Sequence, residues 1–120
     1  MAGDWKSPAG SVVRVYGCGA ETCLKLVKLE PSAPVTTDQK NPDASLRGRA
    51  LCGLVIGTGF HASDADHLVE GHIYDPKSGH TYRGTIVAEG DALKLHGYIG
   101  ISLFGRMEVW SRVGAVEACR

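Results

Sequence analysis

The sequence predicts an all-β fold, a small antiparallel up-and-down β-barrel of about eight strands formed by one domain over residues 1–120. Short runs of β-forming residues recur along the chain and are separated by turn sequences. Sixteen glycines, several of them inside those runs, indicate a sheet that bends on itself. Closing such a sheet removes the exposed edges that an open sheet must protect, and a β-sandwich is the structural alternative.

The expected strands follow one another as a meander. A short strand lies around Trp5, and the others cover residues 11–16, 23–29, 51–58, 68–74, 81–88, 92–99 and 106–113. The alternation is clearest in the third strand, where Leu24 and Leu26 interleave with lysines. Residues 30–49 are expected to form a long polar loop, in which Asp43 caps a short helical turn. Residues 61–66 are predicted as a second polar loop, and a further turn is expected around residues 102–105.

The turn sequence at residues 75–79 predicts a β-hairpin. Pro76 presets φ at the first turn position, Gly79 supplies a positive φ, and Asp75 is expected to cap the turn. Period-two alternation then assigns the faces of the flanking strands, and a bulge at Gly71, Gly84 or Gly97 would reverse part of that assignment. The predicted interior residues are Val69, Ile73, Tyr82, Ile86, Leu93 and Leu95. The predicted exterior residues are Glu70, His72, Arg83, Lys94 and His96.

The charge balance argues against some partners. Thirteen basic and thirteen acidic side chains cancel, whereas nucleic acids and anionic membranes attract a basic face. No apolar run approaches the roughly 20 residues that a membrane-spanning helix needs. The first residues also lack the pattern of a signal peptide, so the chain is either cytosolic or an exported protein whose leader has been removed.

Four cysteines favour the exported alternative. Cys18 and Cys23 flank a short turn, and Cys52 and Cys119 make the count even, as expected for two disulfides in a small domain. Free buried thiols are the alternative, and a zinc site is disfavoured because the C-x4-C spacing lacks a second pair.

A triplet and a late arginine indicate a particular kind of barrel. Gly3-Asp4-Trp5 precedes the first strands, and Arg112 lies in the last one. This combination resembles the lipocalin-like, or calycin, barrels. The resemblance implies that Trp5 closes one end of the barrel and that Arg112 stacks across it.

Motifs along nearly the whole chain, in order, resemble a bacterial family of exported domains of unknown function with lipocalin-like barrels. The matching residues are the Cys18 and Cys23 pair, Asn41-Pro42-Asp43 with Leu46-Arg47 and Arg49, Gly71-x-Ile73-Tyr74-Asp75-Pro76-x-Ser78-Gly79-x-Thr81-Tyr82, Leu93-Lys94-x-x-Gly97-Tyr98, Phe104-Gly105-Arg106 and Trp110-x-Arg112. The resemblance implies a periplasmic or secreted location, and it implies no established reaction. Cys52 and Cys119 are additions to that pattern.

Two groups of side chains are candidates for binding a small apolar or amphipathic ligand. Arg47 belongs to a polar cluster on the long loop that could form a lip over the barrel mouth, although capping and ion pairing within the loop is the favoured explanation. Four amphipathic aromatic residues could line a pocket or simply pack: Tyr74, Tyr82, Tyr98 and Trp110.

Catalytic and metal chemistry is not expected. The segment from His67 to His72 has the wrong spacing for a zinc-protease motif and lies on a strand. The polar residues His61, Asp64, Asp66 and His67 are interpreted as a solvated loop rather than a metal site. No nucleophile with an accompanying base is apparent, so no cofactor, metal or reaction is predicted. The leading hypothesis is a ligand-binding barrel, and the alternative is a filled barrel that acts as a cell-envelope interaction module. The oligomeric state stays open.

Overall fold

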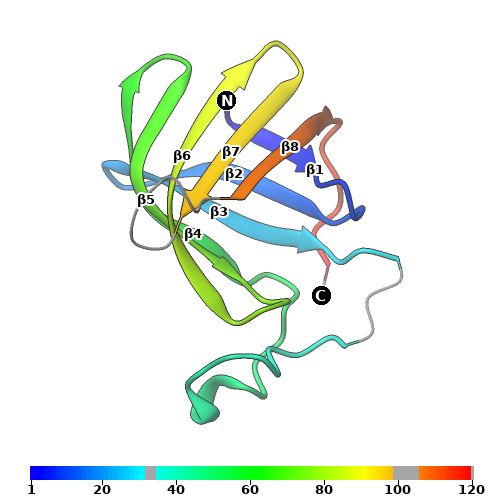
Figure 1. Ribbon diagram of the computed structural model, residues 1–120. Helices are drawn as coiled ribbons and strands as arrows, with labels where there is room; N and C mark the ends of the chain where they lie inside the picture. The colour runs from blue at the N-terminus through cyan, green and yellow to red at the C-terminus, as the bar shows by residue number, and fades with distance from the viewer. Residues whose placement is uncertain (32–34, 99–105, 120) are drawn as a thin grey trace.

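The computed structural model describes residues 1–31, 35–98 and 106–119 of the chain, and these form a closed antiparallel barrel. Each strand pairs with the next, and the first pairs with the last (Figure 1). The strands are β1 (Gly3–Lys6), β2 (Val12–Cys18), β3 (Glu21–Lys28), β4 (Val55–Asp64), β5 (His67–Asp75), β6 (His80–Glu89), β7 (Ala92–Tyr98) and β8 (Arg106–Val113). The predicted eight-stranded meander is confirmed.

The long connection between β3 and β4 carries the predicted helical turn. A 3-10 helix, η1 (Ala44–Leu46), begins after Asp43, whose carboxylate accepts a hydrogen bond from the backbone N–H of Ser45 at 3.0 Å. Figure 1 shows this connection extending away from one end of the barrel. It is therefore placed to shape the opening at that end. The turn expected around residues 102–105 lies outside the described residues.

The predicted position of β4 is wrong. The strand begins at Val55 and continues to Asp64, so residues 61–64 are strand rather than loop. β3 pairs with β4 only as far as Phe60, and the side chains of residues 61–64 are all exposed. Because both faces of this part of the hairpin meet water, its sequence shows no apolar alternation and resembles a loop.

The facing assignment is correct on β6 and β7 and wrong at one residue of β5. Leu68, rather than Val69, lies in the core, opposite Ile86. The register shifts between Leu68 and Gly71, and Glu70 adopts a φ of 60°. This irregularity reverses the alternation, so that Val69 faces outward. His72 and Arg83 are exposed and paired with each other on the outer face, as expected.

One end of the barrel is filled by the core. Trp5 and Phe60 are fully buried there among aliphatic side chains. The guanidinium of Arg112 lies 4.2 Å from the centroid of the Trp5 ring, which is a cation–π contact. Gly3 has a φ of 126°, and a Cβ at this position would already touch Arg112. The tryptophan and the arginine therefore close this end in the way expected of the Gly-x-Trp triplet.

The C-terminal residues run back over the outside of the barrel. Arg14 pairs with the buried Asp4 at 2.8 Å, and Asp4 also accepts a hydrogen bond from the backbone N–H of Val116. Farther along, the N–H of Cys119 donates to the carbonyl of Val27 at 2.8 Å. We call residues 114–119 the C-terminal strap, because they cross β1, β2 and β3.

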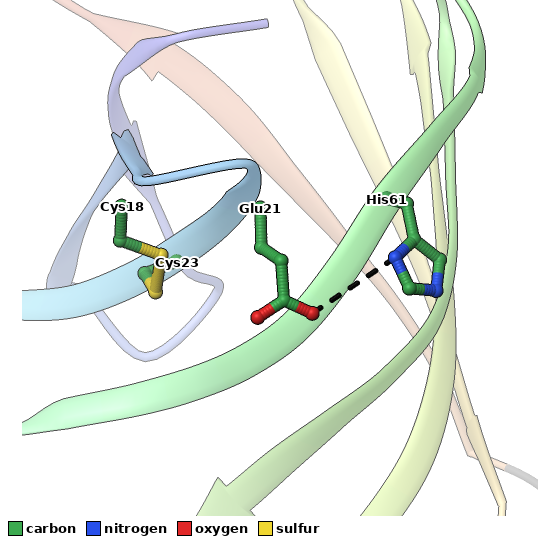
Figure 2. The surroundings of a disulfide bond; sticks show 4 residues. All are labelled: Cys18, Glu21, Cys23 and His61. Atoms are coloured by element: carbon green, nitrogen blue, oxygen red, sulfur yellow. Dashed lines mark ion pairs between the residues drawn. A yellow bond between two sulfur atoms is a disulfide. The ribbon is translucent and has the colours of Figure 1, made fainter.

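Two disulfides are present: the expected bridge between Cys18 and Cys23, and a bridge between Cys52 and Cys119, whose pairing the sequence left open. Cys18–Cys23 closes the β2–β3 turn, and Cys52–Cys119 ties the C-terminal strap to the long loop. Figure 2 shows Glu21, the first residue of β3, reaching toward His61 of β4, and 3.9 Å separates Glu21 Oε2 from His61 Nδ1. The second disulfide joins segments 67 residues apart and so restrains the loop that shapes the open end.

Candidate ligand-binding cavity

A cavity of about 750 Å³ occupies the open half of the barrel. Aliphatic side chains from five strands form its walls: Val13, Leu26, Ile56, Ile73 and Leu95. Ligand sites in proteins commonly have volumes of about 300–1,000 Å³ and mainly apolar walls. The open half of the interior is therefore not filled by side chains, and with its mainly apolar walls it has the size of a site for one small molecule.

The rim of the cavity is built from the long loop, the β5–β6 turn and the β1–β2 turn. Asp75 caps its turn as expected, since its carboxylate accepts hydrogen bonds from the N–H of Lys77 and the hydroxyl of Ser78, both at 3.0 Å. Gly79 has a φ of 78°, and a Cβ there would run into the carbonyl oxygen of Lys40. Glycine is thus required at this position both by the turn and by the close approach of the loop.

A buried carboxylate fastens the loop to the barrel. Asp38 is fully buried and accepts hydrogen bonds from Tyr74 Oη at 2.6 Å, Asn41 Nδ2 at 2.9 Å and Arg49 Nε at 2.9 Å. Burial and the neighbouring carboxylate raise the pKa of Tyr74 to about 12, so the hydroxyl stays protonated and remains a donor. We call these four residues the Asp38 cluster.

The cavity includes some of the predicted ligand-binding residues and leaves others outside. Tyr82 and Trp110 line it. Tyr74 alternates with the inward Ile73 and touches the cavity only at the rim, where its hydroxyl binds Asp38. Arg47 does not line the cavity; it is exposed and donates to the carbonyl of Asn41 at 2.8 Å. The side chain of Tyr98 lies outside the described residues.

Glu108 is a cavity residue that the sequence reasoning missed. It lies opposite Leu95 in the β7–β8 register, lines the cavity, and accepts a hydrogen bond from Trp110 Nε1 at 2.7 Å. Strand alternation could have located it, because Glu108 and Trp110 are two residues apart and share a face. Its carboxylate adds a polar group to a stretch of wall that is mainly apolar.

The polar residues at the far end of β4 and β5 pair among themselves. His67 Nδ1 lies 2.8 Å from Asp64 Oδ1, and His61 Nε2 lies 3.2 Å from Glu70 Oε2. Across residues 1–31, 35–98 and 106–119, no group of three or more histidine, cysteine, aspartate or glutamate side chains is arranged to hold a metal ion. In the same ranges, no helix is long and apolar enough to cross a membrane.

Comparison with known proteins identifies the family. Residues 3–112 match the bacterial family DUF2147, described as an uncharacterized protein conserved in bacteria. The chain belongs to the DUF2147 family. No curated protein matches the sequence.

A solved structure resembles this DUF2147 chain throughout. The protein HP1028 from the human pathogen Helicobacter pylori, described as belonging to the lipocalin family, superimposes with a TM-score of 0.85 at 17% identity. The match covers 95% of this chain and 83% of HP1028. The DUF2147 chain therefore has a lipocalin-like barrel, as the Gly-x-Trp triplet and Arg112 indicated.

Proposed function

We propose that this DUF2147 protein binds a small apolar or amphipathic ligand inside its barrel and performs no chemical step on it. The observation that carries the proposal is the cavity of about 750 Å³ with aliphatic walls. Transfer of apolar ligand surface from water to such walls is favourable by about 25 cal/mol per Å², which supplies a driving force for binding. One end is sealed by Trp5, while the other is framed by the tethered loop.

The proposal includes an extracytoplasmic location. Two disulfides link the four cysteines of the chain, and no free cysteine is present among the described residues. Disulfides persist in the periplasm and outside the cell, whereas the cytosol keeps most thiols reduced. The DUF2147 family is described as conserved in bacteria, so the proposed location is the periplasm or the outside of a bacterial cell.

A second candidate function is recognition of another protein through the outer face of β8. Met107 is 65% exposed and Val109 is 52% exposed, and both lie on the face opposite Glu108 and Trp110. Exposed apolar neighbours on one strand are typical of contact surfaces. This candidate needs no ligand inside the barrel.

Native mass spectrometry of the protein isolated from a periplasm without reductant tests both candidates. The binding proposal expects a removable extra mass, and a chain mass about four hydrogens below the reduced value for two disulfides. The Ile73→Trp variant, which places an indole in the cavity, is expected to lose the extra mass. Val69→Trp is the matched control, because it introduces the same side chain on the outer face of the same strand. A bare wild-type chain, with no uptake of added amphiphiles, would overturn the binding proposal and favour the outer-face candidate.

A further inference from the structure

The outer face of the first three strands is covered by the C-terminal strap. Asp4 alternates with the inward Trp5, yet it is only 3% exposed, and its Oδ2 accepts the N–H of Val116 at 2.8 Å. Val12 and Val27 are also buried, although neither belongs to the core cluster inside the barrel. A sheet face that met water would carry polar side chains at such positions. This outer face is therefore built to be covered.

The strap that covers this face adds no strand to the barrel. Residues 114–119 lie outside the strands, and they run from the end of β8 toward the end of β3 (Figure 1). Arg14 Nη2 donates to the carbonyl of Val116 at 2.8 Å, and the N–H of Cys119 binds β3. A chain end without sheet pairing opens readily unless something ties it down. The bridge from Cys119 to Cys52 ties down the end of the strap.

The two disulfides differ in what they hold in place. Cys18 and Cys23 lie in the paired strands β2 and β3, so the ladder keeps this hairpin together without their bridge. Cys52 is also fixed, because the N–H of the adjacent Gly53 donates to a carbonyl of β3 at 2.8 Å. Cys119 lies on a segment that has no strand partner. Opening of its bridge would therefore free the strap and leave the other segments where they are.

The bridge that holds the strap can be reached by a thiol. Exchange begins when a thiolate attacks one sulfur of a disulfide, so it requires access to that sulfur. Cys52 and Cys119 are both half-buried, whereas Cys23 of the other bridge is 8% exposed. Attack on the strap's bridge is thus open at either of its two residues.

We propose that the Cys52–Cys119 bridge is a redox latch, which holds the strap on the outer face of β1–β3 and releases it on exchange with a dithiol. One thiolate of the dithiol attacks a sulfur of the bridge, and the second then displaces the resulting mixed disulfide. Two electrons and two protons pass to Cys52 and Cys119, which become thiols, and the donor becomes a disulfide. Release uncovers Asp4 and Val27. The latch acts outside the barrel and does not depend on a ligand within it.

Amide hydrogen exchange of the native full chain, measured by nuclear magnetic resonance, tests the latch. The oxidised protein is compared with protein in excess dithiothreitol, and a parallel sample labelled with a maleimide shows which bridge has opened. The amides of Val116 and Cys119 are expected to exchange at least about thirtyfold faster after reduction, the factor that corresponds to the lower end of the stabilisation a disulfide provides. The paired amides of β5 and β6 are expected to stay protected, because the barrel remains closed.

Two double variants assign the effect to one bridge. Cys18→Ser with Cys23→Ser keeps only the latch and is expected to respond to dithiothreitol as the wild type does. Cys52→Ser with Cys119→Ser is the matched control: it keeps only the hairpin bridge, and its strap is expected to exchange fast both before and after the reductant is added. Circular dichroism shows whether each variant is folded. If the control does not fold, reduction of the wild type provides the same comparison without a substitution.

Three outcomes would overturn the latch. Strap amides that stay protected after the Cys52–Cys119 bridge has opened would show that hydrogen bonds alone hold the strap. Simultaneous loss of protection in β5 and β6 would show that the bridge holds the whole fold rather than the strap. A Cys52–Cys119 bridge that the native protein keeps in excess dithiothreitol would show that exchange does not reach it.

Discussion

Substitution of Asp38 by alanine is expected to destabilise the protein by about 3 kcal/mol. The change removes the acceptor of three hydrogen bonds, and two of the donors are shielded from water: Asn41 is 5% exposed and Tyr74 is half-buried. A donor that is buried without a partner costs about 1–3 kcal/mol. Arg49 contributes less, because its side chain is 37% exposed and water can replace the carboxylate.

Thermal unfolding with both disulfides intact measures this loss. For a domain of this size, about 3 kcal/mol corresponds to a decrease in Tm of roughly 10 °C or more. Asp43→Ala is the matched control: it removes another loop aspartate, the exposed cap of η1, and is expected to cost about 1 kcal/mol. A loss for Asp38→Ala no greater than that for Asp43→Ala would refute the argument from buried donors.

The pH dependence of stability provides a second readout of the same carboxylate. Burial alone would raise the pKa of the Asp38 carboxyl, but hydrogen bonds from Tyr74, Asn41 and Arg49 outweigh burial and hold the pKa below its ordinary value. The unfolded chain therefore binds this proton more tightly than the folded one. The stabilisation is complete above about pH 5 and is lost as pH falls through the lowered folded pKa. Asp38→Asn is expected to flatten that part of the acid unfolding profile, and an unchanged profile would contradict the assignment.

Three further predictions concern single contacts. Gly71→Ala is expected to lower the free energy of unfolding in urea by about 1–3 kcal/mol, because the new Cβ would run into the fully buried ring of Phe60. The same substitution made in a Phe60→Leu background is expected to cause a smaller loss, which would confirm the clash. Cys119→Ser breaks the bridge to Cys52 and is expected to lower the free energy of unfolding by about 4 kcal/mol, because the unfolded chain regains the entropy that the crosslink removes. Equal melting temperatures of the oxidised wild type and the variant would contradict this. Ultraviolet titration is expected to show Tyr74 ionising at about pH 12, with Tyr74→Phe as the control that removes this transition.

The sequence predicts the strands best where one face is buried and the other meets water. β3, β6, β7 and β8 have that environment, and the predicted ranges agree with the structure to within a residue or two. β4 lacks it, because beyond Phe60 it has no β3 partner and no core beneath it. A strand that is solvated on both faces gives no period-two signal, so residues 61–64 could not be distinguished from a loop.

The facing of the strands and the site were predicted only in part, for three different reasons. The irregularity that turns Val69 outward ends at Gly71, one of the glycines at which a bulge was considered, but its exact place depends on the positive φ of Glu70, which the residue type does not predict. By contrast, Glu108 could have been predicted to face the cavity, because it shares a strand face with Trp110. Residue type alone does not indicate that position, since charged side chains are mostly exposed. The position of Arg47 depends on how the long loop folds back on itself, and local sequence contains little of that information.

The pairing of β1 with β8 has a consequence for when the fold can form. Trp5 lies opposite Arg112, and Cys119 is joined to Cys52, so the first and last segments of the chain complete the structure together. A ribosome or a translocation channel that still holds residues 111–119 would keep β8 from pairing with β1. Until then the chain is an open sheet with two unpaired edges, the form most prone to pair with other chains. Closure therefore requires residues 111–113 to be free to pair with β1, and a chain cut short before residue 111 would keep its edges exposed.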